Sequence, residues 1–212
     1  MPQTNKIIIV GTGGFAKEIT FLLSRLEDYE LVGYVDDNKD KLGDFLLGKP
    51  IIGDSDYLLD LNEGYQVAIG IADPQIKKRL CEKLQAGPLL KFPNLIDPSV
   101  LIGLDIKMGI GNIIMANTSF TSSIELGNFN MINIGSTIGH DVRMGNYNSL
   151  FPSVNVSGYV NIKDRVSIGV GSKIIQEVTI ENDAIIGAGS VVIRDIANNT
   201  KNVGVPTRVI EG

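Results

Sequence analysis

The residue type best suited to proton transfer near neutral pH occurs once in this chain, at His140, and Asp141 follows it directly. A solvent-facing imidazole can act as a general base, and an adjacent carboxylate can orient the ring or raise its basicity. The repeat described below places His140 outward at a turn, not in the core. We therefore predict a general base at His140, with an ordinary surface histidine as the alternative.

Glycines and acidic residues mark a second candidate site. The segment 11–15 (GTGGF) lies between a strand-like run and a helical pattern, where glycines let the backbone approach a phosphate at a helix N-terminus. Asp36 and Asp37 end the next strand-like run, where an acidic side chain can reach a ribose hydroxyl. Gly70 ends a third such run at the same sheet edge. These features predict a nucleotide site, with tight packing and no ligand as the alternative.

The composition excludes several classes of protein. Nineteen basic against 24 acidic residues give a net charge of −5, which argues against a general nucleic-acid binder. A single cysteine, Cys81, excludes an internal disulfide framework, and a single histidine excludes a metal site that needs several imidazoles from one chain. No apolar run approaches the ~18 residues that span a membrane, and the N-terminus lacks the pattern of a signal peptide. We expect a cytoplasmic enzyme with no metal and no membrane insertion.

The elements that must position these residues fall into two parts. Over residues 1–95, strand and helix patterns alternate, which favours a small α/β domain resembling half of a Rossmann fold. We expect strands over 6–10, 31–35 and 66–71, a helix from about 15 to 26, a second from 74 to 85 and a short helix over 55–61. Asp73 is the predicted N-cap of the second helix, with proline at its first position.

From residue 102 onward the apolar period is six. Every sixth residue is apolar, and with 43% apolar composition the chance of this in one register is roughly one in a million. The members are Ile102, Met108, Ile114, Phe120, Leu126, Ile132, Ile138, Met144, Leu150, Val156, Ile162, Ile168, Ile174, Ile180, Ile186 and Val192. This is the hexapeptide signature of a parallel β-helix, in which three hexads close a coil. We expect the β-helix over 96–196 and a capping tail over 197–212.

The coil of three hexads predicts which residues are neighbours along the β-helix. Asn112, Asn130 and Asn148 occupy the same inward position on three successive coils, so we expect them to stack as an amide ladder. The same step places Gly158 on the coil next to His140.

Together these features resemble the two-domain left-handed β-helix sugar acyltransferases, which comprise nucleotide-amino-sugar N-acetyltransferases of the bacillosamine-pathway type and the sialic acid O-acetyltransferase group. The resemblance covers essentially the whole chain. It rests on residues 11–15, Asp36-Asp37, residues 68–70, the junction 92–96, Gly139-His140-Asp141, the hexads and the Gly-Val-Pro-x-Arg tail at 204–208.

The resemblance implies the roles of individual residues. It implies a homotrimer in which acetyl-CoA, the co-substrate, lies along the β-helix between two subunits. It assigns catalysis to His140 as base, Asp141 as the acid that tunes it and Gly158 as an oxyanion donor; acetyl-CoA binding to Ser149, Val170 and Ala188; and nucleotide-sugar binding to Gly13, Gly14, Phe15, Asp36, Asp37 and Gly70.

The leading hypothesis is transfer of an acetyl group from acetyl-CoA to the 4-amino group of a nucleotide-linked 4-amino-4,6-dideoxy sugar, with UDP as the expected nucleotide, in bacterial surface glycan synthesis. The alternative reaction is O-acetylation of sialic acid or another sugar hydroxyl. The alternative without catalysis is an inactive trimer that binds a nucleotide sugar.

Overall fold

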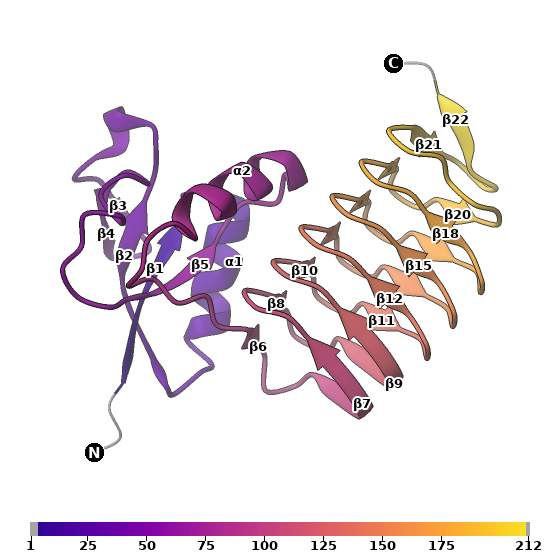
Figure 1. The fold of residues 1–212 in the computed structure, drawn as a ribbon, viewed down its shortest axis with the longest axis horizontal. Coiled ribbons are helices and arrows are strands. Elements are labelled where there is room, and N and C mark those ends of the chain that lie inside the picture. Colours follow the sequence, from indigo (N-terminus) through magenta and orange to yellow (C-terminus); the bar gives the residue numbers. More distant parts are fainter. Residues whose placement is uncertain (1–3, 211–212) are drawn as a thin grey trace.

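A computed structural model describes residues 4–210, in which an α/β domain lies at one end of a long β-helix (Figure 1). The sheet of the α/β domain has the strand order β3-β4-β2-β1-β5, and all neighbours are parallel except β3 and β4. Its elements are β1 (Asn5–Val10), α1 (Gly14–Leu23), β2 (Tyr29–Val35), the 3₁₀ helix η1 (Lys39–Lys41), β3 (Phe45–Leu46), β4 (Lys49–Gly53), β5 (Gln66–Ile69) and α2 (Pro74–Leu84). The predicted half-Rossmann domain is confirmed.

Local sequence explains how the two helices begin. Asp73 caps α2 by accepting hydrogen bonds from the backbone N–H groups of Gln75 (2.9 Å) and Ile76 (2.8 Å), as predicted. At the start of α1, Gly13 is the N-cap residue and has no side chain to cap the helix. The first-turn N–H groups of α1 therefore face the turn that follows β1 without a side-chain cap.

The short helix expected over residues 55–61 is wrong, because this segment forms a series of turns. The Asp54 carboxylate accepts a hydrogen bond from the Tyr57 N–H (3.0 Å), and Leu59 N–H bonds to the Asp56 carbonyl (2.9 Å). Each of these bonds joins a residue to the third one after it, so the segment turns tightly and does not continue as an α-helix.

The β-helix has three faces. Face 1 contains β6 (Leu95–Ile96), β8 (Ile113–Ile114), β10 (Met131–Ile132), β13 (Ser149–Leu150), β16 (Ser167–Ile168), β19 (Ile185–Ile186) and β21 (Lys201–Val203). Face 2 contains the first parts of β7 (Leu101–Met108) and β9 (Ser119–Leu126), then β11 (Thr137–Ile138), β14 (Asn155–Val156), β17 (Lys173–Ile174) and β20 (Val191–Val192). Face 3 contains the ends of β7 and β9, then β12 (Arg143–Met144), β15 (Asn161–Ile162) and β18 (Thr179–Ile180).

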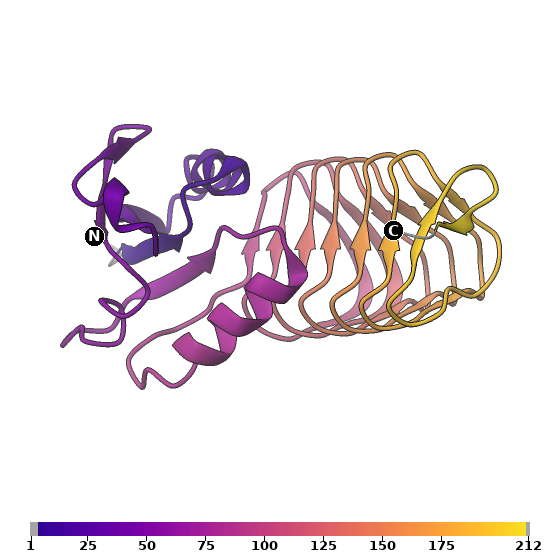
Figure 2. The same ribbon diagram turned by 90° about the horizontal axis from the view of Figure 1, so that it is seen from above.

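Parallel pairing between equivalent hexads stacks the coils, as in the pairs Met131↔Ser149 and Ser149↔Ser167 (Figure 2). The apolar residues of the hexads fill the interior, and from Ile114 to Val192 all of them are buried. Ile102 is 48% exposed because its strand, β7, is the edge of the helix and pairs only with β9. The predicted parallel β-helix is therefore confirmed, with an open edge at its first coil.

The predicted amide ladder is present. The side-chain amide of Asn130 donates to the side-chain carbonyl of Asn112 (3.0 Å), and the Asn148 backbone N–H donates to that of Asn130 (2.9 Å). Asn94 extends the ladder by one coil, because its side-chain carbonyl accepts from the Asn112 amide (3.1 Å). The ladder ends at Asn148, whose side-chain carbonyl accepts from the Val166 N–H (2.7 Å) and whose buried amide nitrogen has no partner within residues 4–210.

The coil changes at the C-terminal end. Ile185 pairs with Lys201, so the last coil is shorter than those before it, and β22 (Arg208–Ile210) then runs antiparallel to β21. The Gly-Val-Pro-x-Arg sequence forms the connection between β21 and β22, and its Arg208 is the first residue of β22. This hairpin completes the last rung of face 1.

The α/β domain packs on face 1. Ile19 of α1 shares a buried cluster with Ile113 and Met131 of that face. Arg25 holds Asp97 through two hydrogen bonds (2.5 and 3.0 Å), and this pairing lowers the pKa of the Asp97 carboxyl to about 2. The first coils of face 1 are therefore covered within the chain, whereas Ile185 further along it is 43% exposed.

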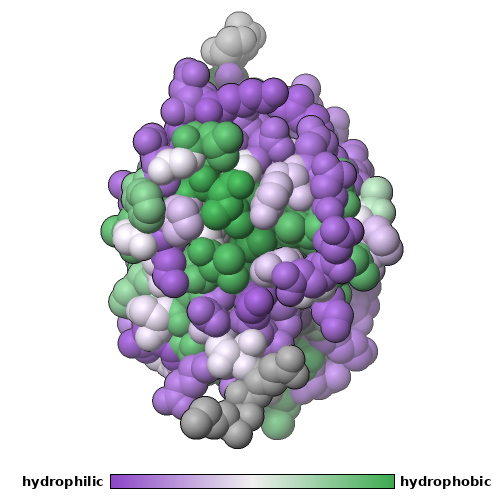
Figure 3. Space-filling model, turned by 90° about the vertical axis from the view of Figure 1, so that its left-hand side faces the viewer, coloured by the Kyte–Doolittle hydropathy of each residue, from purple (hydrophilic) through white to green (hydrophobic). Residues whose placement is uncertain are grey.

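The opposite end of the α/β domain is more open. Seen from that end, apolar side chains gather at the middle of the surface, with polar ones around them (Figure 3). The domain exposes Leu42, Phe45 and Leu47 to solvent. None of the helices within residues 4–210 is long and apolar enough to cross a membrane.

Candidate active site

His140 lies in the turn that joins face 2 to face 3, and its side chain is 54% exposed. Its Nδ1 atom is 2.9 Å from a carboxylate oxygen of Asp141. Because a carboxylate can only accept, a neutral imidazole in this arrangement carries its proton on Nδ1 and leaves the Nε2 lone pair free. The ring of Tyr159 meets the imidazole edge-on, with the centroids 5.1 Å apart. This geometry orients the ring for proton abstraction at Nε2.

Gly158 lies one coil from His140 and makes room for the imidazole. A Cβ atom at Gly158 would lie 2.5 Å from Cε1 and 2.6 Å from Nε2 of His140. The Gly158 N–H donates no hydrogen bond within residues 4–210, so it can serve a ligand. Gly139 allows the coils to approach, because a Cβ there would be 2.8 Å from the Gly158 nitrogen. The three residues thus place a base and a free N–H donor together.

The turn after β1 is open on its outer side. A Cβ atom at Gly13 or Gly14 would meet nothing within 4 Å, so there is room in front of the α1 N-terminus. Asp36 follows β2 beside this turn and accepts a hydrogen bond from the Thr12 hydroxyl. Asp37 is exposed, and one of its carboxylate oxygens accepts from the Ser55 N–H (2.9 Å). Asp37 is therefore the acid that has an oxygen available for a ligand hydroxyl.

Two other residues predicted for this site have packing roles. Phe15 is 9% exposed and belongs to the cluster between α1 and face 1. A Cβ atom at Gly70 would lie 2.9 Å from the Val10 carbonyl oxygen and 3.0 Å from the Ala16 Cβ, so this glycine allows β5 to lie close to α1. We therefore omit both from the ligand contacts proposed below.

The three residues predicted to bind acetyl-CoA differ in exposure. Val170 is 49% exposed and Ala188 is exposed, and both lie in turns between face 1 and face 2, one coil apart. Ser149 is completely buried on face 1. Its hydroxyl donates to the Ala72 carbonyl (2.5 Å) and accepts from Lys77 (2.8 Å), so it presents no surface to a ligand.

Lys77 is a buried lysine beside Ser149 that the sequence pattern did not single out. It is 2% exposed, and its Nζ donates to the Asn148 carbonyl (2.9 Å) and to the Ser149 hydroxyl. Burial lowers the pKa of its amine to about 7. The available signal was its helical spacing with Cys81 and Leu84, which are buried on the same side of α2.

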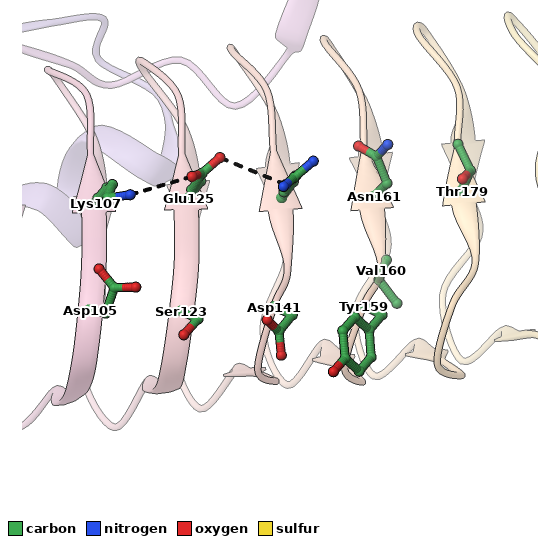
Figure 4. A pocket seen from close by; sticks show the side chains of 10 residues that line it. Asp105, Lys107, Ser123, Glu125, Asp141, Tyr159, Val160, Asn161 and Thr179 are labelled. Atoms are coloured by element: carbon green, nitrogen blue, oxygen red, sulfur yellow. Dashed lines mark ion pairs between the residues drawn. The ribbon is translucent and has the colours of Figure 1, made fainter.

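A hollow of about 520 Å³ lies on face 3 beside the His140 turn (Figure 4). Asp141 and Tyr159 line it, so two of the residues beside the His140 ring border this space. A row of alternating charge crosses its floor, from Lys107 to Glu125 (3.6 Å) and from Glu125 to Arg143 (3.8 Å). The sequence pattern was also not used to predict Tyr159. It lies one coil after Asp141, so the coil step places it beside the His140 turn.

The structure does not bring the two candidate sites together within one chain. The α/β domain lies on face 1, whereas His140 lies on the turn between faces 2 and 3. In a three-sided prism that turn is opposite face 1. The two candidate sites therefore lie on different sides of one chain.

The comparisons with known proteins concern the α/β domain alone in one case and the whole chain in the others. Residues 6–84 match the PglD N-terminal domain family. Perosamine N-acetyltransferase from Caulobacter crescentus, solved as a histidine-to-asparagine variant with CoA and GDP-perosamine, is 29% identical, with 98% of each chain covered and a TM-score of 0.90. Over both domains the chain is similar to the left-handed β-helix sugar acyltransferases. This confirms the predicted fold, its handedness and the class of enzyme.

Two further solved structures are similar to this chain over the same extent. The acetyltransferase domain of PglB from Neisseria gonorrhoeae, solved with acetyl-CoA, is 25% identical over 98% of this chain and 100% of that one, with a TM-score of 0.89. WeeI from Acinetobacter baumannii AYE is 26% identical over the same shares, with a TM-score of 0.88. A search of curated proteins finds no match.

Proposed function

We propose that this acyltransferase transfers the acetyl group of acetyl-CoA to the amino group of a nucleotide-linked amino sugar. The observation that carries the proposal is the likeness, over both domains, to an N-acetyltransferase solved with CoA and a nucleotide amino sugar. The exposed pair of His140 and Asp141 supports it, because amine acetylation needs a base that accepts one proton.

In the proposed mechanism, the sugar amine attacks the thioester carbonyl carbon while Nε2 of His140 takes a proton from the amine. A C–N bond forms, a tetrahedral intermediate follows, and the C–S bond breaks. The imidazolium then returns the proton to the CoA thiolate, so the products are the acetamide and free CoA. Asp141 keeps Nδ1 protonated and stabilises the imidazolium, and the free N–H of Gly158 stabilises the oxyanion.

The two substrates are assigned to different parts of the molecule. The nucleotide sugar binds the turn of Gly13 and Gly14, with Asp37 accepting from a hydroxyl group. Acetyl-CoA lies along the exposed turns of Val170 and Ala188. Because the glycine turn and His140 lie on opposite sides of one chain, the working site is formed between subunits of a homotrimer.

The acceptor proposed at the finest level is a 4-amino-4,6-dideoxy sugar of bacterial surface glycan synthesis. UDP is the nucleotide expected from sequence, and the Caulobacter relative was solved with a GDP sugar. The substrate panel therefore contains UDP-, GDP- and dTDP-linked amino sugars. O-acetylation of a free sugar is the second candidate, since a base at His140 serves a hydroxyl as well as an amine.

The test is to incubate the protein with acetyl-CoA and each sugar of the panel, with sialic acid as the free-sugar arm, and to follow release of free thiol. Acetylated product identified by mass spectrometry on an amino nitrogen supports the proposal. Turnover only with sialic acid, together with no binding of UDP, GDP or dTDP in calorimetric titration, would replace it with the O-acetyltransferase. No turnover with any arm, but tight binding of a nucleotide, would favour an inactive binding protein.

A further inference from the structure

One cation contacts the glycine turn. The Lys41 Nζ atom, at the end of η1, is 2.9 Å from the Thr12 hydroxyl oxygen and 2.9 Å from a carboxylate oxygen of Asp36. Within residues 4–210, no other lysine or arginine side chain forms a hydrogen bond with residues 11–15. The turn that follows β1 is therefore joined to the segment that follows β2 by an ammonium group.

The carboxylate of Asp36 accepts three hydrogen bonds from the protein. One oxygen accepts from the Asn38 N–H (3.0 Å), and the other accepts from Thr12 and Lys41. Burial alone would raise the pKa of Asp36, but the hydrogen bonds from Thr12, Asn38 and Lys41 outweigh it and lower this pKa. Asp36 therefore holds Lys41 in place, and the oxygen that accepts from Asn38 keeps one acceptor site for the ribose contact expected from sequence.

Lys41 in contrast has a donor to spare. An ammonium has three N–H groups, and the Thr12 and Asp36 contacts use two of them. The Lys41 side chain is 41% exposed, whereas that of Asp36 is 15% exposed, so the positive charge is the outer one of the pair. Lys41 contacts the same turn that contains Gly13 and Gly14, at which no atom lies within 4 Å of an added Cβ.

We propose that Lys41 is a diphosphate-binding residue of the nucleotide-sugar site, held in place by Asp36 and Thr12. This inference rests on the proposed function, since it assigns a ligand contact within that site. The uncapped N–H groups of α1 and the ammonium then approach the diphosphate from two directions. Lys41 thus determines affinity for the diphosphate and has no contact with the sugar or the base.

The variant K41M tests the assignment, with K39M as the matched control, because Lys39 is an exposed lysine on the same short helix. Calorimetric titration with UDP, GDP and dTDP should show binding to K41M weakened roughly 10- to 100-fold, and to K39M unchanged. The decline of affinity with rising ionic strength should be shallower in K41M. K41R should recover most of the affinity, and KM for acetyl-CoA and the melting temperature should stay at wild-type values.

The outcomes separate this inference from the proposed function. If the wild type binds none of the three diphosphates, the nucleotide-sugar function fails first. If the wild type binds one of them and K41M binds it equally well, with the same salt dependence, the assignment of Lys41 is wrong while the function stands. If K41M weakens the parent nucleoside as much as the diphosphate and lowers the melting temperature, Lys41 has a structural role only; K41Q repeats this comparison with a second neutral side chain.

Discussion

His140 is set apart from the other residues of its turn by what its ring touches. One nitrogen is held by Asp141 and the ring lies against Gly158 and Tyr159, while over half of the side chain remains exposed. An exposed side chain contributes little packing, so its chemistry and the stability of the fold can be separated by substitution.

We expect His140→Ala to reduce kcat/KM by about 10² or more with an unchanged melting temperature, because general-base catalysis is worth that much. Asp141→Asn should cost less, since it removes only the orientation and charge that Asp141 supplies. Steady-state kinetics on the identified sugar, with thermal melting as the fold control, measures both. Near wild-type turnover in the alanine variant would show that another group or water takes the proton.

Gly158→Ala tests the packing of the ring. The new methyl group would overlap Cε1 and Nε2 of His140, which can move away because the imidazole is exposed. We expect kcat to fall by about tenfold or more, because a displacement of order ~1 Å at the reacting atoms is enough for such a loss. KM for acetyl-CoA and thermal stability should change little. A variant with unaltered kcat would mean that the ring is catalytically competent in another position.

For single residues, the sequence predicted where a side chain lies along the β-helix better than it predicted what that side chain contacts. The coil step located His140 on an outward turn, and the same step applied to Asp141 leads to Tyr159. Phe15 and Ser149 were expected at ligands, but both are buried where the α/β domain meets face 1. That contact depends on how two domains dock, and neither the coil period nor the strand pattern contains this information.

Among the elements, the turns of the β-helix depend most on inward polar ladders. The Asn112–Asn130 step satisfies amide and backbone groups that are completely buried. A second ladder, through Asn128, Asn146 and Asp164, runs alongside it. Buried polar groups without partners are costly, so the ladders connect each coil to the next.

We expect Asn130→Ala to lower the free energy of unfolding by about 1–3 kcal/mol, since it leaves the Gly145 carbonyl without its side-chain donor and the Asn148 N–H without its acceptor. The control is Asn155→Ala, which removes a solvent-exposed amide that bonds to Thr137 and should change stability by less than about 0.5 kcal/mol. Urea unfolding compares the two. Equal effects would mean that burial of the ladder is not what makes it stabilising.

Elements with a strong periodic pattern were predicted correctly, and those with a weak pattern were not. The hexad series predicted the coils, and capping by Asp73 predicted the start of α2. Residues 55–61 have a weaker helical pattern, and the hydrogen bond that the Tyr57 N–H donates to the Asp54 carboxylate holds them in a turn. The sequence did not predict that the last coil is shorter. The hairpin of β21 and β22 covers the open end of the β-helix, and this contact is not visible in the hexad pattern.

For the whole molecule, we expect the free energy of unfolding to depend on pH through Lys77, which lies where the α/β domain contacts the β-helix. Its folded-state pKa of about 7 lies below the ~10.4 of an unfolded lysine. Between these values the unfolded chain binds a proton that the folded chain lacks, so the free energy of unfolding should rise with pH by at most about 1.4 kcal/mol per unit. Below pH 7 both states are protonated and the cost of burying the charge is present in full.

Cys81 acts in the opposite direction, because burial raises the pKa of its thiol to about 12, above the ~8.5 of a free cysteine. Stability from this group is lost as pH rises above about 8.5, so the clean window for Lys77 is about pH 7 to 8.5. Urea unfolding in a Cys81→Ala background, with and without Lys77→Met, isolates the effect. An identical pH dependence in the two proteins would show that Lys77 does not titrate at the junction.

The assembled state follows from the separation of the two sites. We expect light scattering at micromolar concentration to give the mass of a trimer, since the turn of His140 and the α/β domain of the same chain lie on opposite sides of the prism. Mixing His140→Ala with a Gly13→Val variant after dissociation should restore part of the activity, because some sites then combine two intact halves. A monomer mass with full activity would contradict the shared site.

The constant step of the coils also limits how this chain can change in evolution. A single deletion within a face would turn every later inward side chain outward or sideways, so length can vary only by whole coils or by loops extruded at the turns. Duplication of one coil between His140 and Val170 would preserve the interior but move the proposed acetyl-CoA contacts about 4.8 Å further from the base. The length of this β-helix can therefore change only in steps of one coil. Each added coil changes the distance between the base and the proposed acetyl-CoA contacts, which a co-substrate of fixed length must span.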